Sequence, residues 1–280
     1  IVLDPIFIFL LDMGVQGAAL ATIIAQFFST VWAVSFLRGK RTLIRLEPSA
    51  MKLQLKLVWQ IISLGFSSFV MAITNSIVQV ACNSTLQTFG GDLYVGVMTI
   101  INSVREVVST PINGVTHAAQ PVMGFNYGAK EYKRVRAGIL FTTILCVVYT
   151  TVVWLLLFLF PRFFTGLFSN ETALREAAVP SMHIYFFGFF MMSLQMAGQS
   201  AAVALGRSKQ AVFFSLFRKV VIVAPLTLLL PHLFGLGVTG VFLAEPISNF
   251  IGGAACYITM LLTIWREMRR KEKAPLTEQT

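Results

Sequence analysis

One carboxylate, Glu106, stands near the middle of a long apolar stretch that runs from Asp92 to Arg136. Steps of three and four residues return to the same side of a helix, so the polar residues of this stretch share one face. That face carries Thr99, Asn102, Ser103, Glu106, Ser109, Thr110, Asn113, His117 and Gln120. A charge inside a membrane is costly, so we expect Glu106 to face a wet cavity, where it could bind and release a cation. The alternative is a structural ion pair with another helix. Arg105 points about 100° away on a helix and need not be that partner.

Amide and methionine side chains recur at helical spacing in two further apolar segments. In the first segment, Asn75, Gln79 and Asn83 follow one another at intervals of four residues, which places them on one face. The other candidates for a cavity wall are Gln195, Gln199, Met192 and Met196, joined by Asn102 and Asn113 from the Glu106 helix. Unbranched methionine suits a pocket that accepts varied ligands. Hydrogen bonding between helices and ordinary packing are the alternative roles.

The elements that position these residues are predicted to be membrane helices. Hydrophobic residues make up 56% of the 280 residues, and charged residues make up 12%, against about 25% in soluble proteins. Apolar runs longer than roughly 18 residues recur, so we predict an all-α polytopic transmembrane bundle. After a half-span at Ile1–Leu11, the spans are Val15–Leu37, Val58–Thr85, Leu93–Met123, Ile139–Phe160, Val179–Leu205, Ala211–Leu230 and Val238–Trp265. Gly90 and Gly91 predict a tight turn between the second and third spans, and Pro111 with Gly114 predicts a kink or an unwound turn.

Basic residues are distributed unevenly between the two ends of these spans. Of the 22 Lys and Arg residues, 19 fall on one side, in the segments 38–56, 130–136 and 207–219 and after Trp265. The positive-inside bias makes this side and the C-terminus cytoplasmic, in a multi-pass protein of the bacterial cytoplasmic membrane. The net charge of +10 then reflects topology, so the expected partner is the lipid bilayer and not nucleic acid. Arg218 and Lys219 are expected to extend toward lipid headgroups.

An internal repeat predicts two lobes. The segment beginning at Gly14 aligns with the segment beginning at Gly237, with seven identities in 24 positions and an offset of 223 residues. Both copies begin Gly-Val-x-Gly and run in the same direction, as in parallel lobes. We therefore predict that residues 1–37 are the last one and a half helices of an N-terminal lobe, that 38–56 form a cytoplasmic loop, that 57–266 form a complete six-helix lobe, and that 267–280 form a cytoplasmic tail. The offset places the start of the missing N-terminal lobe, a further expected partner, 166 residues before Ile1.

Three groups of residues carry a resemblance to a known family. They are Asp4 and Pro5 near the start, the run Gln120, Pro121, Val122, Met123, Gly124, Phe125, Asn126, Tyr127 and Gly128, and Arg218 with Gly235, Glu245 and Pro246. These motifs resemble the multidrug and toxic compound extrusion (MATE) family of the MOP superfamily. The resemblance implies a two-lobed antiporter that exchanges H+ or Na+ for drugs and other amphipathic, often cationic, compounds by alternating access. Pro246 after Glu245 also predicts a stabilised kink in the last span.

The sequence departs from the family pattern in its acidic residues. Family members commonly carry an acid in the first helix, which this chain lacks, and some use acids in the seventh and tenth helices. The corresponding spans, Val58–Thr85 and Val179–Leu205, contain no Asp or Glu. Glu106 is therefore the candidate for cation coupling.

Other classes of function remain as alternatives. A lipid-linked oligosaccharide flippase of the same superfamily would be favoured by more charge around the cavity than this sequence indicates, and a truncated fragment would not transport. The sequence has no metal-ligand cluster, nucleophile motif or phosphate loop, so we expect neither an enzyme nor a cofactor.

Overall fold

The computed structural model describes residues 3–39, 54–233 and 235–273, and within these ranges the chain forms helices joined by turns, without a strand. The predicted all-α helical bundle is confirmed. The chain divides into two compact units, residues 1–63 and 64–280. The predicted loop at 38–56 lies largely outside the described residues, and of the predicted tail, residues 267–273 are described, as helix, so the four predicted regions stay a prediction.

The smaller unit contains α1 (Leu3–Pro5), the π-helical segment η1 (Ile6–Leu10), α2 (Gly14–Arg38) and the first turns of α3. A Cβ atom at Gly17 would lie 2.7 Å from the carbonyl oxygen of Phe7, so glycine allows η1 and α2 to pack closely. Of the α2 side chains, only Gly17 and Ala21 are buried. The motif residues Asp4 and Pro5 lie in α1.

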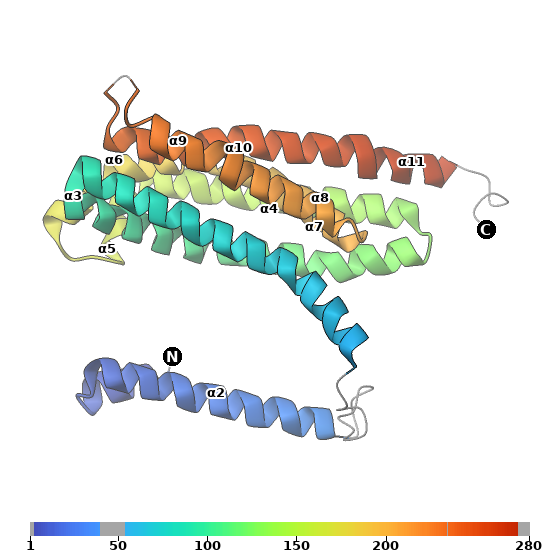
Figure 1. The fold of residues 1–280 in the computed structure, drawn as a ribbon, viewed down its shortest axis with the longest axis horizontal. Coiled ribbons are helices and arrows are strands. Elements are labelled where there is room, and N and C mark those ends of the chain that lie inside the picture. Colours follow the sequence, from blue (N-terminus) through green and yellow to red (C-terminus); the bar gives the residue numbers. More distant parts are fainter. Residues whose placement is uncertain (1–2, 40–53, 234, 274–280) are drawn as a thin grey trace. The chain divides into compact units, whose positions relative to one another are not determined.

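The larger unit is a bundle whose helices run along a common direction, as Figure 1 shows. Its elements are α3 (Leu55–Gly128), α4 (Tyr132–Leu159), α5 (Pro161–Gly166), α6 (Thr172–Tyr185), α7 (Phe189–Ala204), α8 (Ser208–Leu216), the π-helical η3 (Phe217–Val223), α9 (Ala224–Leu229), α10 (Val238–Met260), the π-helical η4 (Leu261–Trp265) and α11 (Arg266–Lys273).

The long helix α3 is a hairpin of two arms. Gly91 has φ 66° and ψ −166°, a non-helical conformation that glycine adopts without a steric penalty, and the chain turns back there (Figure 1). Gln87 Nε2 donates to the Asp92 carboxylate at 2.9 Å across the turn. The predicted turn is thus confirmed at Gly91. The helix continues through Pro111 and Gly114, however, so the predicted unwound turn does not form there.

The helices match the predicted spans. Within the described residues, four helical stretches are long and apolar enough to cross a membrane: Gly14–Arg38, Tyr132–Leu159, Ser208–Leu229 and Val238–Glu272. A fifth arises if α6 and α7, which meet at a 54° bend, form one span. The remaining two predicted spans coincide with the arms of α3, which are not among these stretches. The bend falls at Gly188, whose φ of 78° lies in the left-handed region.

The apolar side of the second α3 arm forms much of the core. Val97, Ile101, Val104 and Ile112 are almost fully buried and pack with residues of α4, α6, α7 and α10. On the opposite side Thr99, Glu106, Thr110 and His117 are exposed. This division follows the predicted polar face closely.

The Gln120–Gly128 motif ends α3 and contacts the last helix. Lys271 of α11 lies over the rings of Tyr127 and Tyr132, at 5.4 and 5.6 Å from the ring centroids. The amide of Asn126 donates to the carbonyl of Val122 at 2.8 Å, and a Cβ at Gly124 would lie 3.1 Å from the carbonyl oxygen of Ala204 in α7. The structure therefore gives these motif residues packing and capping contacts.

Candidate functional site

A polar cavity of about 720 Å³ opens inside the larger unit. Its walls come from both arms of α3, the end of α6, α7, the α8–η3–α9 helix and α10. Its lining includes Asn75, Gln79, Cys82, Arg105, Glu106, Ser109, Asn113, Tyr185, Met192, Gln195, Met196, Gln199, Arg218, Lys219, Thr227 and Glu245. This volume suits a drug-sized organic molecule.

A buried ionic cluster forms one wall of the cavity. The Arg218 guanidinium donates through Nη1 to Glu245 Oε1 at 2.9 Å and to the side-chain oxygen of Asn249 at 2.8 Å. The Lys219 ammonium lies 3.5 Å from Glu245 Oε2. Side-chain exposures are 11% for Arg218, 14% for Lys219 and 8% for Glu245, so the cluster is largely withdrawn from solvent.

Local backbone structure explains how two adjacent basic residues reach one carboxylate. Arg218 and Lys219 lie in the π-helical segment η3. A π-helical turn holds more residues than an α-helical one, so consecutive side chains diverge by a smaller angle. On the facing helix, Gly252 leaves room for the Arg218 chain, because a Cβ there would lie 2.9 Å from Arg218 Cγ. Short π-helical segments are frequent at functional sites.

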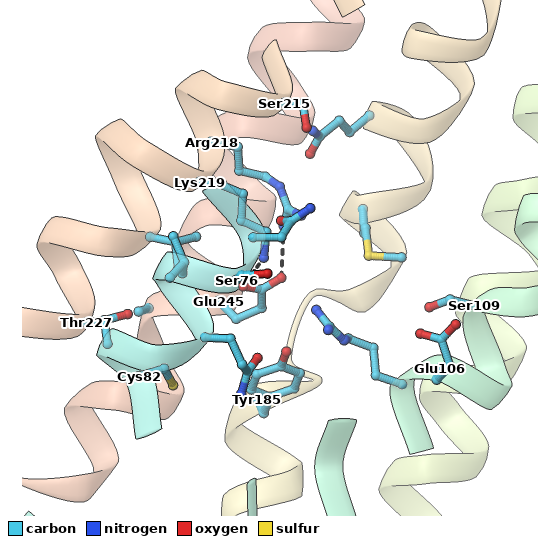
Figure 2. Close-up of a pocket in the computed structure, with 18 of the residues that line it drawn as sticks. Ser76, Cys82, Glu106, Ser109, Tyr185, Ser215, Arg218, Lys219, Thr227 and Glu245 are labelled. Atoms are coloured by element: carbon cyan, nitrogen blue, oxygen red, sulfur yellow. Dashed lines mark hydrogen bonds and ion pairs between the residues drawn. The ribbon is translucent and has the colours of Figure 1, made fainter. Parts of the chain in front are cut away.

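Glu106 and Ser109 lie across the cavity from this cluster. Figure 2 shows Arg218 and Lys219 extending toward Glu245 on one side, with Glu106 and Ser109 on the other. Glu106 is exposed and lines the cavity. Arg105 also lines the cavity and interacts electrostatically with Tyr185, Glu245 and Glu106. The described residues contain no ion pair within 4.0 Å that involves Glu106.

Most of the amide and methionine candidates line the cavity, but two do not. Asn75, Gln79, Asn113, Met192, Gln195, Met196 and Gln199 line it. Asn83 instead accepts a hydrogen bond from Gln79 at 3.1 Å, and Asn102 lies outside the cavity lining. Gln199 also donates to the carbonyl of Ala211 at 3.1 Å, which links α7 to α8. The two interpretations offered for these amides, cavity wall and inter-helix bonding, therefore both apply to Gln199.

Two expectations from the sequence are wrong. Arg218 and Lys219 do not extend to headgroups, because the carboxylate of Glu245 pairs with both inside the bundle. Glu245 forms that ion pair, and α10 remains α-helical through Pro246, so the kink at Pro246 stays a prediction. The cavity is also more highly charged than expected, since five ionisable side chains of the acidic and basic types line it.

The sequence carried a signal for this cluster. Arg218 and Lys219 stand eight and nine residues into the predicted span Ala211–Leu230, well away from its end. Charges at such a depth usually pair with one another, and Glu245 is a carboxylate inside the following span. Tyr185, in contrast, reaches the cavity because α6 ends at the 54° bend, which has no comparable sequence signature.

A multi-pass helical bundle built around a polar, charged cavity is the architecture of a membrane transporter. The chain belongs to the MatE family, whose family model, described as MatE, matches residues 67–229.

Two similar curated relatives are the multidrug export proteins MepA of Staphylococcus saprophyticus and Staphylococcus aureus. The first is 24% identical over 280 residues, 99% of this chain and 60% of the relative. The second is 22% identical over 270 residues, 95% of this chain and 57% of the relative. The chain thus spans about 60% of the length of these relatives.

Solved structures show the same fold. A crystal structure of a MATE protein in complex with MaL6 matches with a TM-score of 0.84 and 21% identity, covering 98% of this chain and 61% of that protein. A MOP superfamily transporter from Pyrococcus furiosus, described as having a binding pocket of reverse polarity, matches with a TM-score of 0.85 and 21% identity. The match covers 98% of this chain and 60% of that protein. These likenesses establish the fold of a MATE transporter for this chain.

Proposed function

We propose that the chain forms the C-terminal, substrate-binding part of a cation-coupled exporter of amphipathic organic compounds. The observation that carries this proposal is the cavity of about 720 Å³ lined by amides, methionines and charged groups within a MatE-family bundle. Methionines such as Met192 and Met196 are adaptable enough to contact ligands of different shapes. The names of the two staphylococcal relatives support export of several drugs.

Glu106 is the proposed coupling residue. It is a carboxylate in a membrane helix, it faces the cavity, and Ser109 and Asn113 lie one and two turns further along the same wall. Binding of H+ or Na+ by Glu106 would alternate with substrate binding as two lobes exchange access to the two sides of the membrane. The residues on the basic side, with the C-terminus, are proposed to be cytoplasmic.

Dye export by the full-length protein tests this proposal. We expect cells of an efflux-deficient bacterial strain that express the protein to expel ethidium faster than control cells, and inverted vesicles to show which of a proton or sodium gradient drives the exchange. Glu106→Gln keeps the side-chain shape and removes its charge, so export should fall to the background rate at normal expression. Glu171→Gln makes the same change at an exposed carboxylate outside the cavity and should leave export unchanged.

The outcomes separate the roles of Glu106. Normal export by Glu106→Gln at normal expression would exclude coupling, and loss of expression alone would favour a structural role. An unmodified protein that is expressed and exports nothing would contradict the exporter itself.

The charge around the cavity favours a second candidate, transport of a lipid-linked anionic molecule by a flippase of the same superfamily. Five charged side chains line the cavity. A charged cavity is the feature that would favour such a flippase, and the sequence alone does not predict it. Flipping of a fluorescent lipid-linked pyrophosphate in proteoliposomes, without ethidium export, would select this candidate.

A further inference from the structure

We propose that three basic side chains that line the cavity, those of Arg105, Arg218 and Lys219, bind an anionic group, a carboxylate or phosphate, of the transported molecule. This proposal names the substrate class of the cavity and rests on the proposed function. It differs from the cationic compounds that the family resemblance implies.

The charges of the cluster do not balance. Both oxygens of the Glu245 carboxylate are engaged, one by Arg218 at 2.9 Å and the other by Lys219 at 3.5 Å, so one negative charge faces two positive charges. The other partner of Arg218, Asn249, is a neutral amide. All three charged side chains are at most 14% exposed. Excess charge in a largely buried site is unfavourable unless a counterion compensates it.

Arg105 adds a third positive charge to the cavity. It lines the cavity from α3 and interacts electrostatically with Tyr185, Glu245 and Glu106. The one other carboxylate that lines the cavity, Glu106, lies across from the cluster and is exposed (Figure 2). The cavity therefore carries three cations against two carboxylates, and its buried cluster carries two cations against the single carboxylate of Glu245. An anionic group that entered the cavity would supply the missing negative charge.

Neutral groups indicate what else the ligand carries. The Gln195 side chain is 4% exposed and lines the cavity, and its Oε1 atom has no hydrogen-bond partner among the described residues. A buried carbonyl oxygen of this kind needs a donor. The ligand that fits both features has an anionic group for the basic side chains of Arg105, Arg218 and Lys219 and an N–H or O–H group for Gln195. A simple cation would suit the Gln195 oxygen but would be repelled by the three basic side chains.

The Lys219 ammonium is the group to change. Its contact with Glu245 is long, and Lys219→Gln leaves Arg218 and Glu245 as a balanced pair, so the fold should persist. A hydrogen bond from a charged group contributes enough free energy to binding that loss of the Lys219 ammonium should weaken anion binding by about tenfold or more. Lys219→Arg keeps the charge and should restore binding.

Equilibrium binding of a matched dye pair tests the proposal. The full-length protein in phosphatidylcholine nanodiscs is titrated with a rhodamine dye that has a free carboxylate and with its methyl ester, which differs only at that group. We expect the carboxylate dye to bind more tightly than the ester, and Lys219→Gln to remove this preference. Lys209→Gln is the control, because Lys209 is exposed near the start of α8 and does not line the cavity.

Competition distinguishes the possible sources of the anion. Displacement of the carboxylate dye by sodium pyrophosphate would support a soluble anion, and displacement in nanodiscs that contain phosphatidylglycerol would support a lipid headgroup. Equal binding of the two dyes, tighter binding of the ester, or an unchanged preference in Lys219→Gln would each overturn the proposal. Binding is measured at equilibrium, without an ion gradient. The binding result therefore stands by itself if the transport assays contradict the exporter proposal.

Discussion

Arg218 and Glu245 form a salt bridge of 2.9 Å inside the bundle, between η3 and α10. Their side chains are 11% and 8% exposed, and Lys219 adds a second cation at the other carboxylate oxygen. The expected effects of substitution depend on which member of this cluster is removed.

Glu245→Gln should be strongly destabilising. It leaves Arg218 and Lys219 largely buried without a counter-charge, and breaking a buried pair in this way costs about 3–5 kcal/mol. The thermal unfolding midpoint in detergent should fall clearly below that of the unmodified protein. The matched control is Glu267→Gln, which makes the same change in a carboxylate that is 22% exposed and pairs with Arg207 and Lys271. A surface pair of that kind contributes about 1 kcal/mol or less. Similar midpoints for the two variants would contradict the buried cluster.

The two basic partners of Glu245 should differ in their effect on stability. Lys219→Met leaves the short Arg218–Glu245 bond and removes the excess positive charge, so stability should be unchanged or increased. Arg218→Met leaves the 3.5 Å contact of Lys219 and removes the donor to Asn249, whose oxygen then loses its partner. The loss of that hydrogen bond should cost about 1–3 kcal/mol. The thermal unfolding midpoint, measured side by side for the two variants, should be lower for Arg218→Met than for Lys219→Met. A lower midpoint for Lys219→Met would contradict the excess positive charge of the cluster.

Gly252→Ala should displace Arg218. The new Cβ would lie within 2.9 Å of Arg218 Cγ and 3.0 Å of its Cδ, so the arginine chain must shift away from α10. Overpacking of this kind typically costs about 1–3 kcal/mol. Gly114→Ala is the control, because a Cβ there meets no other atom within 4 Å and alanine favours the helix by roughly 0.5–1 kcal/mol. The unfolding midpoint should fall for the first variant and rise for the second.

Cysteine labelling should establish the orientation of the larger unit. Cys82, Cys146 and Cys256 are free and buried, so an impermeant maleimide should react with them slowly. Introduced cysteines at the exposed positions Lys209 and Asn170 lie at opposite ends of the bundle by the predicted topology. In intact cells, Asn170→Cys should be labelled and Lys209→Cys should be labelled only after the membrane is opened. Labelling of Lys209→Cys from outside would reverse the orientation.

Sequence patterns predicted the fold better than the arrangement of the site. The length of the apolar runs, the break at Gly91 and the polar face around Glu106 follow from local periodicity, and the structure has all three. The Arg218–Lys219–Glu245 cluster depends on a tertiary contact and on the π-helical turn of η3. Neither feature produces a periodic pattern in the sequence. The positive-inside bias counts Arg218 and Lys219 together with the basic residues of the cytoplasmic side. Their depth in the span, which is the informative property, does not enter that count.

The hairpin at Gly91 limits which sequence changes the cavity can tolerate. Glu106, Ser109 and Asn113 face the cavity only because their distance from the break sets their rotation about the helix axis. Inserting one residue between Gly91 and Glu106 would turn all three by about 100° and shift them by about 1.5 Å, with every side chain still present. Evolution can therefore exchange side chains along this arm far more freely than it can change the arm's length.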